Sequence, residues 1–170
     1  MRGSRGFVSK MLVAASLALA ACGSRHSLFV SVSDDSGHAS ADVWVIGALV
    51  WSCCDGPILR AKGRCAKTDS HGAFEFSAST AGKDFAGANS QIKRPGFHLV
   101  DFTTLMGDRL PSGCAADEGD NEISLSCVLT PCGPSAPEGV CVTEFNDASM
   151  HWCDDGFERD DYGGGLDTLP

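Results

Sequence analysis

Cysteine and histidine are the residues of this sequence with the widest range of possible chemistry. The chain has nine cysteines and five histidines among 170 residues. A cysteine thiolate can bind a metal or act as a nucleophile, and two cysteines can form a disulfide. Zinc sites usually pair their ligands as C-x2-C or H-x3-H, and the sequence contains neither spacing. The cysteines therefore favour disulfides over a metal site.

The first residues of the chain predict export. Arg2, Arg5 and Lys10 precede an uncharged, mostly apolar run over residues 11–21. A basic start followed by a short apolar run and small residues is typical of a secretory signal peptide. The run is too short for a membrane-spanning helix, which needs about 20 apolar residues. We therefore expect residues 1–21 to be removed.

The end of that segment, Leu19-Ala20-Ala21-Cys22, resembles the bacterial lipobox. The resemblance implies that Cys22 becomes the N-terminus and is lipidated on its sulfur and its amine. Each buried methylene contributes about 0.8 kcal/mol, so two or three acyl chains such as palmitate anchor a protein firmly. Gly23 replaces the aspartate that often retains such proteins at the inner membrane, which favours the outer membrane. The alternative is an ordinary cleavage site beside an unmodified cysteine.

With Cys22 lipidated, an even number of cysteines remains, which in an exported protein indicates disulfides. The eight candidates are Cys53, Cys54, Cys65, Cys114, Cys127, Cys132, Cys141 and Cys153. Their pairing stays open among 105 possibilities. Adjacent side chains on a strand point to opposite faces, so we expect Cys53 and Cys54 to have different partners. A bond between Cys132 and Cys141, if it forms, would contribute roughly 2.5–3 kcal/mol.

No catalytic or metal-binding constellation is evident. The sequence has no G-x-S-x-G, P-loop or H-E-x-x-H motif, and each of these would indicate a particular chemistry. The histidines are His26, His38, His71, His98 and His151, and no two have ligand spacing on one expected element. We therefore expect no enzyme activity and no cofactor. The alternative is a metal-dependent envelope enzyme, or a metal-binding protein, that uses histidine and aspartate residues from loops.

One acidic segment, residues 117–122 (DEGDNE), offers oxygen ligands that could coordinate calcium. Calcium prefers several oxygens on a loop, but the segment lacks the alternating ligand positions of an EF-hand. We favour a solvated loop. Residues 1–21 hold three of the 13 basic residues and none of the 22 acidic ones, so the remaining chain has a net charge of −12. That charge disfavours a basic face for nucleic acid.

Short β-rich runs separated by turn signals predict the elements that would position these residues. We expect strands over 28–32, 41–51, 64–68, 73–77, 98–105 and 122–130. The glycine-containing turn 69–72 should join 64–68 to 73–77 as a hairpin, while 79–90 and 108–121 should be loops. The expected inner faces comprise Val30, Val32, Val43, Val45, Phe74, Phe76, Val100, Phe102 and Leu125. Trp44 would then point outward, toward a partner or under the cysteine-rich insertions near residues 52–62 and 108–121.

Four segments, in order, resemble those of carboxypeptidase-regulatory-like, or transthyretin-like, β-sandwich domains. They are VSDDSGHASADVWV (32–45), TDSHGAFEF (68–76), KRPGF (93–97) and EISLSCVLTP (122–131). The resemblance implies an all-β, antiparallel, Ig-like or transthyretin-like β-sandwich over residues 27–132, here braced by disulfides. Related dioxygenases bind iron through two tyrosines and two histidines. The single tyrosine here, Tyr162, lies in the acidic C-terminal segment, so that site is not expected.

The rest of the chain completes the expected organisation. Residues 22–26 should form a tether, 133–153 a cysteine-containing hairpin, and 154–170 a disordered acidic tail. We therefore expect a lipoprotein of the bacterial cell envelope, at the periplasmic or surface face of its membrane. Its sandwich would bind or scaffold a protein or glycan partner.

Overall fold

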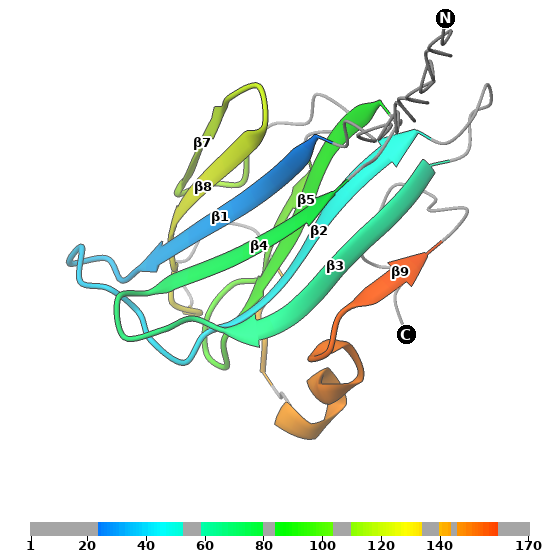
Figure 1. The fold of residues 1–170 in the computed structure, drawn as a ribbon. Helices are drawn as coiled ribbons and strands as arrows, with labels where there is room; N and C mark the ends of the chain where they lie inside the picture. The colour runs from blue at the N-terminus through cyan, green and yellow to red at the C-terminus, as the bar shows by residue number, and fades with distance from the viewer. Residues whose placement is uncertain are drawn as a thin grey trace, which may run out of the picture.

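The computed structural model describes residues 24–52, 59–79, 84–103, 110–133, 140–143 and 146–159. These residues form two β-sheets packed face to face (Figure 1). The all-β sandwich expected from the sequence is confirmed. Cys22, Cys53, Cys54 and Tyr162 lie outside the described residues. No helix within the described ranges is long and apolar enough to cross a bilayer.

The first sheet has four strands in the order β4-β1-β8-β7. Its members are β1 (Arg25–Ser33), β4 (Ala73–Ser79), β7 (Cys114–Glu118) and β8 (Glu122–Val128). The second sheet has five strands in the order β6-β5-β2-β3-β9. Its members are β2 (Trp44–Ser52), β3 (Leu59–Lys67), β5 (Phe85–Lys93), β6 (Val100–Thr103) and β9 (Phe157–Arg159). All described pairings are antiparallel except that of β1 with β8, which is parallel.

The main core lies between the two sheets and follows from the alternation of each strand. Side chains two residues apart share a face of a strand, so Leu28, Val30 and Val32 of β1 all point inward and are buried. Eight of the nine expected inner-face residues are buried, and Phe76 is partly buried against the same cluster. Each fully buried side chain of this kind contributes about 1.5–3 kcal/mol. The core-facing positions are confirmed.

A second, smaller core covers the outer face of the five-stranded sheet. Strand β2 is buried on both faces, and its outward side chains Trp44, Ile46 and Val50 pack with Met150 and Cys153. The covering residues belong to the 3-10 helix η1 (Asp147–Cys153), which leads into β9 beside β3 (Figure 1). Trp44 is only 6% exposed. Among the described residues, the C-terminal segment packs over the outer cluster that contains Trp44.

The C-terminal segment corrects two expectations. The expectation of a disordered tail over 154–170 is wrong for residues 154–159, because β9 extends the five-stranded sheet there. The hairpin expected over 133–153 is also wrong over the described 147–153, which form η1. Sequence composition is acidic here, but Met150, Cys153 and Phe157 supply enough apolar surface to dock on β2 and β3. Residues 160–170 lie outside the described chain.

The turn at 69–72 is confirmed, but the hairpin is not. Asp69 Oδ1 accepts hydrogen bonds from the backbone N–H groups of His71 and Ala73, and Gly72 has a φ of 71°. The turn therefore has the chemistry its sequence indicated. However, β3 pairs with β2 and β9, whereas β4 pairs with β1 in the other sheet. The turn connects a strand of one sheet to a strand of the other and does not join two paired strands.

Two expected loops contain strands. Strand β5 begins within 79–90 and covers residues 85–90 of it, and β7 lies within 108–121. The β5 sequence FAGANSQIK has few residues that favour strands by themselves. Its backbone is nevertheless paired on both sides, with β2 and with β6. These strands depend on their neighbours in the sheet and not on local propensity.

Three disulfides join six of the eight candidate cysteines. Cys65 is bonded to Cys153, Cys114 to Cys127, and Cys132 to Cys141. The first bond ties β3 to η1, and the second joins directly opposed residues of β7 and β8. Because these six cysteines pair among themselves, none of them is the separate partner expected for Cys53 or for Cys54.

Candidate functional site

The outer face of the four-stranded sheet carries a group of serines that we call the serine face. It comprises Ser27, Ser31 and Ser33 on β1, Ser77 on β4, and Ser124 and Ser126 on β8. These positions alternate with the inward apolar residues of the same strands. None of them is buried. Unlike the outer face of the other sheet, this face is not covered by η1 or β9 (Figure 1).

Two hollows lie on the serine face. The first, of about 480 Å³, is bounded by the ends of β1 and β8, the start of β7, and two turns that contribute Gly37 and His71. The second, of about 360 Å³, is lined by Phe29, Asp69, Glu75 and Ser124 among others. Both volumes fall in the range of about 300–1,000 Å³ that is usual for ligand sites.

Ser31 and Ser126 line both hollows and form the ridge between them. The two residues face each other in the β1–β8 register, and their hydroxyl oxygens are 2.8 Å apart. A second serine pair, Ser27 and Ser77, has a hydroxyl–hydroxyl distance of 2.9 Å across β1 and β4. The hydrogen bonds hold these hydroxyls in fixed positions on the sheet surface.

Two turns stand beside the hollows and repeat one arrangement. Asp34 Oδ1 accepts hydrogen bonds from the N–H groups of Ser36 and His38, at 2.9 and 2.8 Å. Asp69 Oδ1 does the same for His71 and Ala73, at 2.8 and 2.9 Å. These donors hold the pKa of both carboxyl groups below its usual value, since they favour the charged form. Both turns are thereby kept in a defined shape at neutral pH.

The structure does not gather the histidines into one site. His38 and His71 occupy the two turns, each with its Nδ1 near an aspartate oxygen, at 3.7 and 3.9 Å. His98 lies opposite Cys141 in an isolated bridge. The side chain of His151 lies outside the described residues. Within the described residues no three histidine, cysteine or acidic side chains form a group that could hold a metal ion.

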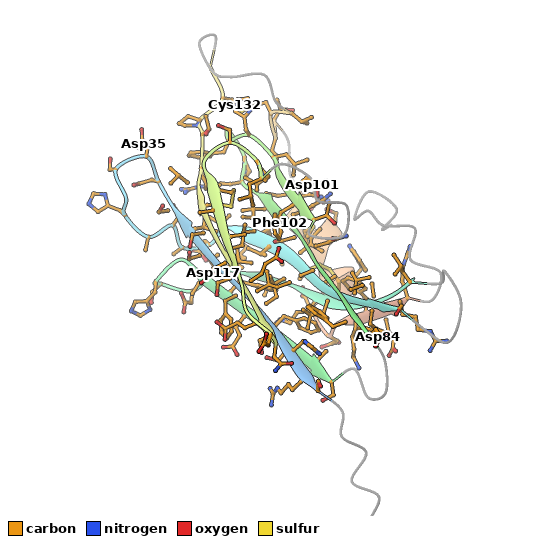
Figure 2. All side chains as sticks on the ribbon, turned by 90° about the horizontal axis from the view of Figure 1, so that it is seen from above. Asp35, Asp84, Asp101, Phe102, Asp117 and Cys132 are labelled. Carbon is orange, nitrogen blue, oxygen red and sulfur yellow. A yellow bond between two sulfur atoms is a disulfide. The ribbon has the colours of Figure 1, made fainter. Side chains whose placement is uncertain are left out.

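The acidic segment 117–122 forms the connection between β7 and β8. Asp117 and Glu118 end β7, Glu122 begins β8, and the N–H of Gly119 donates to the carbonyl of Glu122 at 2.8 Å. Figure 2 shows Asp117 on this strand pair. The expected loop is therefore a tight turn between two paired strands.

His26 corrects the expected tether. Strand β1 begins at Arg25, so Arg25 and His26 belong to the sandwich and not to a linker. His26 is 5% exposed and stacks on Phe85 of β5, with 4.1 Å between ring centroids. Its Nδ1 atom is buried without a hydrogen-bond partner. Burial lowers the pKa of His26 below its ordinary value of 6.5.

We expect the free energy of unfolding to fall as the pH drops below 6.5, the ordinary pKa of the residue. The unfolded state binds the proton more readily than the folded state, so stability is full above that value and is lost through the lower folded-state pKa. Urea unfolding at a series of pH values measures this. His26→Phe keeps an aromatic ring against Phe85 and should flatten the curve. An equal fall in the variant would assign the loss to other groups.

The serine face was missed at the sequence level. The signal was present, since serines occupy positions 27, 31 and 33 of the first segment and positions 124 and 126 of the second, always alternating with apolar residues. However, a strand that buries one face normally carries polar residues on the other face. The alternating serines therefore did not indicate a site by themselves. Only the parallel pairing of β1 with β8 places the two sets side by side.

Comparison with known proteins gives no family and only a distant structural likeness. No family model matches the chain, and no curated protein matches it. Among solved structures, the 3-chlorocatechol 1,2-dioxygenase from Rhodococcus opacus 1CP is similar at 13% identity and a TM-score of 0.37. The match covers 63% of this chain and 59% of that protein, so less than two thirds of its length is represented. A likeness this distant assigns no function.

Proposed function

We propose that this protein is a lipid-anchored protein of the bacterial cell envelope, with a non-catalytic binding module of carboxypeptidase-regulatory-like type. The observation that carries the proposal is the difference between the outer faces of the two sheets. The C-terminal segment covers the five-stranded sheet, whereas the four-stranded sheet exposes polar side chains and two hollows. A surface of this kind suits recognition of a ligand.

The position of Cys22 agrees with this arrangement. Strand β1 begins at Arg25, three residues later, and an extended residue spans at most about 3.3–3.6 Å. The start of β1 would therefore lie roughly 10 Å from a lipidated Cys22. The first hollow is lined by Ser31, Val32 and Ser33, at the other end of β1. The hollow would face away from the membrane.

Figure 2 lets the reader follow these two ends of the sandwich. Asp35 marks the turn after β1, next to the first hollow, and Asp84 precedes β5 at the opposite end. The start of β5 lies beside the start of β1, as the stacking of Phe85 on His26 requires. The three disulfides further support an oxidising compartment outside the cytoplasm.

We expect Cys22→Ala to move the protein from the membrane fraction into the soluble fraction of a bacterial host that processes lipoproteins. Several acyl chains give stable anchoring, so the loss of all of them should move most of the protein. Partition into detergent and mass spectrometry of the N-terminal peptide measure it. Ser24→Ala, which keeps Cys22, is the control and should stay anchored. A wild-type peptide with an unmodified thiol at Cys22 would contradict the proposal.

A further inference from the structure

We propose that the serine face binds a neutral saccharide of at least two sugar units, one in each hollow. This inference rests on the proposed function and names the ligand class of its binding face. Four observations support it: the charge of the lining, the hydroxyl pair of Ser31 and Ser126, the placement of Phe29, and the connection between the two hollows.

The charge of the lining disfavours an anionic ligand. Among the described residues that line the two hollows there is no lysine or arginine. The charged groups are the carboxylates of Asp69 and Glu75, which line the second hollow, and the exposed His71 side chain lines the first. Phosphate and sulfate groups are usually bound by arginine or lysine. A ligand for this face is therefore neutral, with donors that can reach the two carboxylates.

The ridge pair of Ser31 and Ser126 offers both donors and acceptors. Each hydroxyl has one hydrogen and two acceptor lone pairs. The 2.8 Å bond between them uses one hydrogen and one lone pair. The further contact of Ser31 Oγ, to the carbonyl oxygen of Leu125, is 3.5 Å and therefore weak. The pair can still accept hydrogen bonds and donate one, which matches the mixed donor and acceptor character of sugar hydroxyls.

Phe29 provides an apolar surface within this polar face. It lies on β1 directly between Glu75 of β4 and Ser124 of β8 in the two strand registers. All three residues line the second hollow. A sugar ring has an apolar face of C–H groups and a rim of hydroxyls. The ring of Phe29 suits that face, while the carboxylate of Glu75 and the hydroxyl of Ser124 suit the rim.

The sheet itself argues against a peptide in the same place. Peptides that join a sheet pair with unpaired backbone groups at an edge strand. The hollows centre on β1 and β8, whose backbones are already paired with strands on both sides. A ligand on this part of the face therefore meets side chains, because the backbones of β1 and β8 are already used in pairing. The two hollows share Ser31 and Ser126, so a ligand of linked units can occupy both.

The test uses the full processed protein, purified in detergent, and isothermal titration calorimetry with defined tetrasaccharides. The neutral probes are tetramers of N-acetylglucosamine, β-1,4-glucose, α-1,4-glucose and mannose, and a sulfated tetrasaccharide is the anionic comparison. Ser126→Leu places a larger apolar side chain in both hollows, and Phe29→Ala removes the apolar surface. The matched control is Ser79→Leu, an exposed serine on the same face of β4 that lines neither hollow.

We expect at least one neutral probe to bind with a dissociation constant below about 1 mM. Ser126→Leu and Phe29→Ala should each weaken that binding about ten-fold or more, while Ser79→Leu leaves it unchanged. Circular dichroism and the melting temperature check that each variant folds. If Ser126→Leu does not fold, Phe29→Ala still tests the proposal.

Three outcomes of the titrations would overturn the saccharide proposal. They are no binding of any neutral probe, binding that both variants leave intact, or preference for the sulfated probe. A dimer in analytical ultracentrifugation that Ser126→Leu dissociates would show that a second copy occupies the face, and would also overturn it. None of these depends on Cys22. The mass of the N-terminal peptide tests the anchor separately, so the two proposals can fail independently.

Discussion

Replacing both Cys65 and Cys153 by alanine is expected to lower the free energy of unfolding by about 4–5 kcal/mol. The bond closes a separation of 88 residues, the largest among the three disulfides of the described chain. A cross-link restricts the unfolded chain more when the loop it closes is longer. The bond also fastens η1 over β2, so its loss should loosen the cover of Trp44 and Ile46.

Urea unfolding and tryptophan fluorescence together measure this effect. Trp44 is 6% exposed under the C-terminal segment, so its emission should shift to longer wavelength in the native variant. The control replaces Cys132 and Cys141, whose separation is nine residues, and should cost only about 2.5 kcal/mol. Equal losses in the two variants, or unchanged fluorescence in the first, would contradict the role assigned to the Cys65–Cys153 bond.

Gly63→Ala is expected to destabilise the protein by about 3 kcal/mol, at the upper end of the usual overpacking cost. Gly63 faces Ala48 of β2 on one side and Phe157 of β9 on the other. An added Cβ would collide with the backbone carbonyl oxygen of Gly47 and lie 2.6 Å from the ring of Phe157. The backbone of β2 cannot move without disturbing the sheet, so we expect β9 to be displaced.

Two measurements separate this local clash from a general glycine effect. Equilibrium unfolding gives the stability, and amide hydrogen exchange at Phe157, Glu158 and Arg159 reports whether β9 opens. Gly133→Ala is the control, since nothing lies within 4 Å of the added Cβ there, and it should change stability by less than about 0.5 kcal/mol. If Gly63→Ala behaves like this control, the close packing of β9 on β3 is not a stabilising feature.

Turn chemistry was predictable because it depends on residues close together in the chain. Gly37 and Gly72 both adopt positive φ, 80° and 71°, as expected for glycine in tight turns. The partner of each strand was less predictable. The same 69–72 turn suits a hairpin or a crossing between sheets, and the choice depends on which faces the neighbouring strands bury.

Gly47 shows at a single residue why packing between distant segments could not be predicted. Its sequence position indicates only that a glycine weakens the strand that contains it. In the structure, an added Cβ there would lie 2.5 Å from the ring of Phe74, which packs from the other sheet. The space left by the missing side chain is filled by a residue far along the chain. Packing of this kind has no local signal.

The sequence by itself determined the all-β class, the inward residues of the main strands and the tight turns. Alternation and turn residues act over a few positions, so they can be read along the chain. Only the tertiary structure decided the disulfide pairing, the burial of Trp44 and the strands β5, β7 and β9. It also placed the serines of β1 and β8 on one face. These features depend on contacts between distant segments, because a buried partner can stabilise a strand or cover a side chain whose own sequence favours neither outcome.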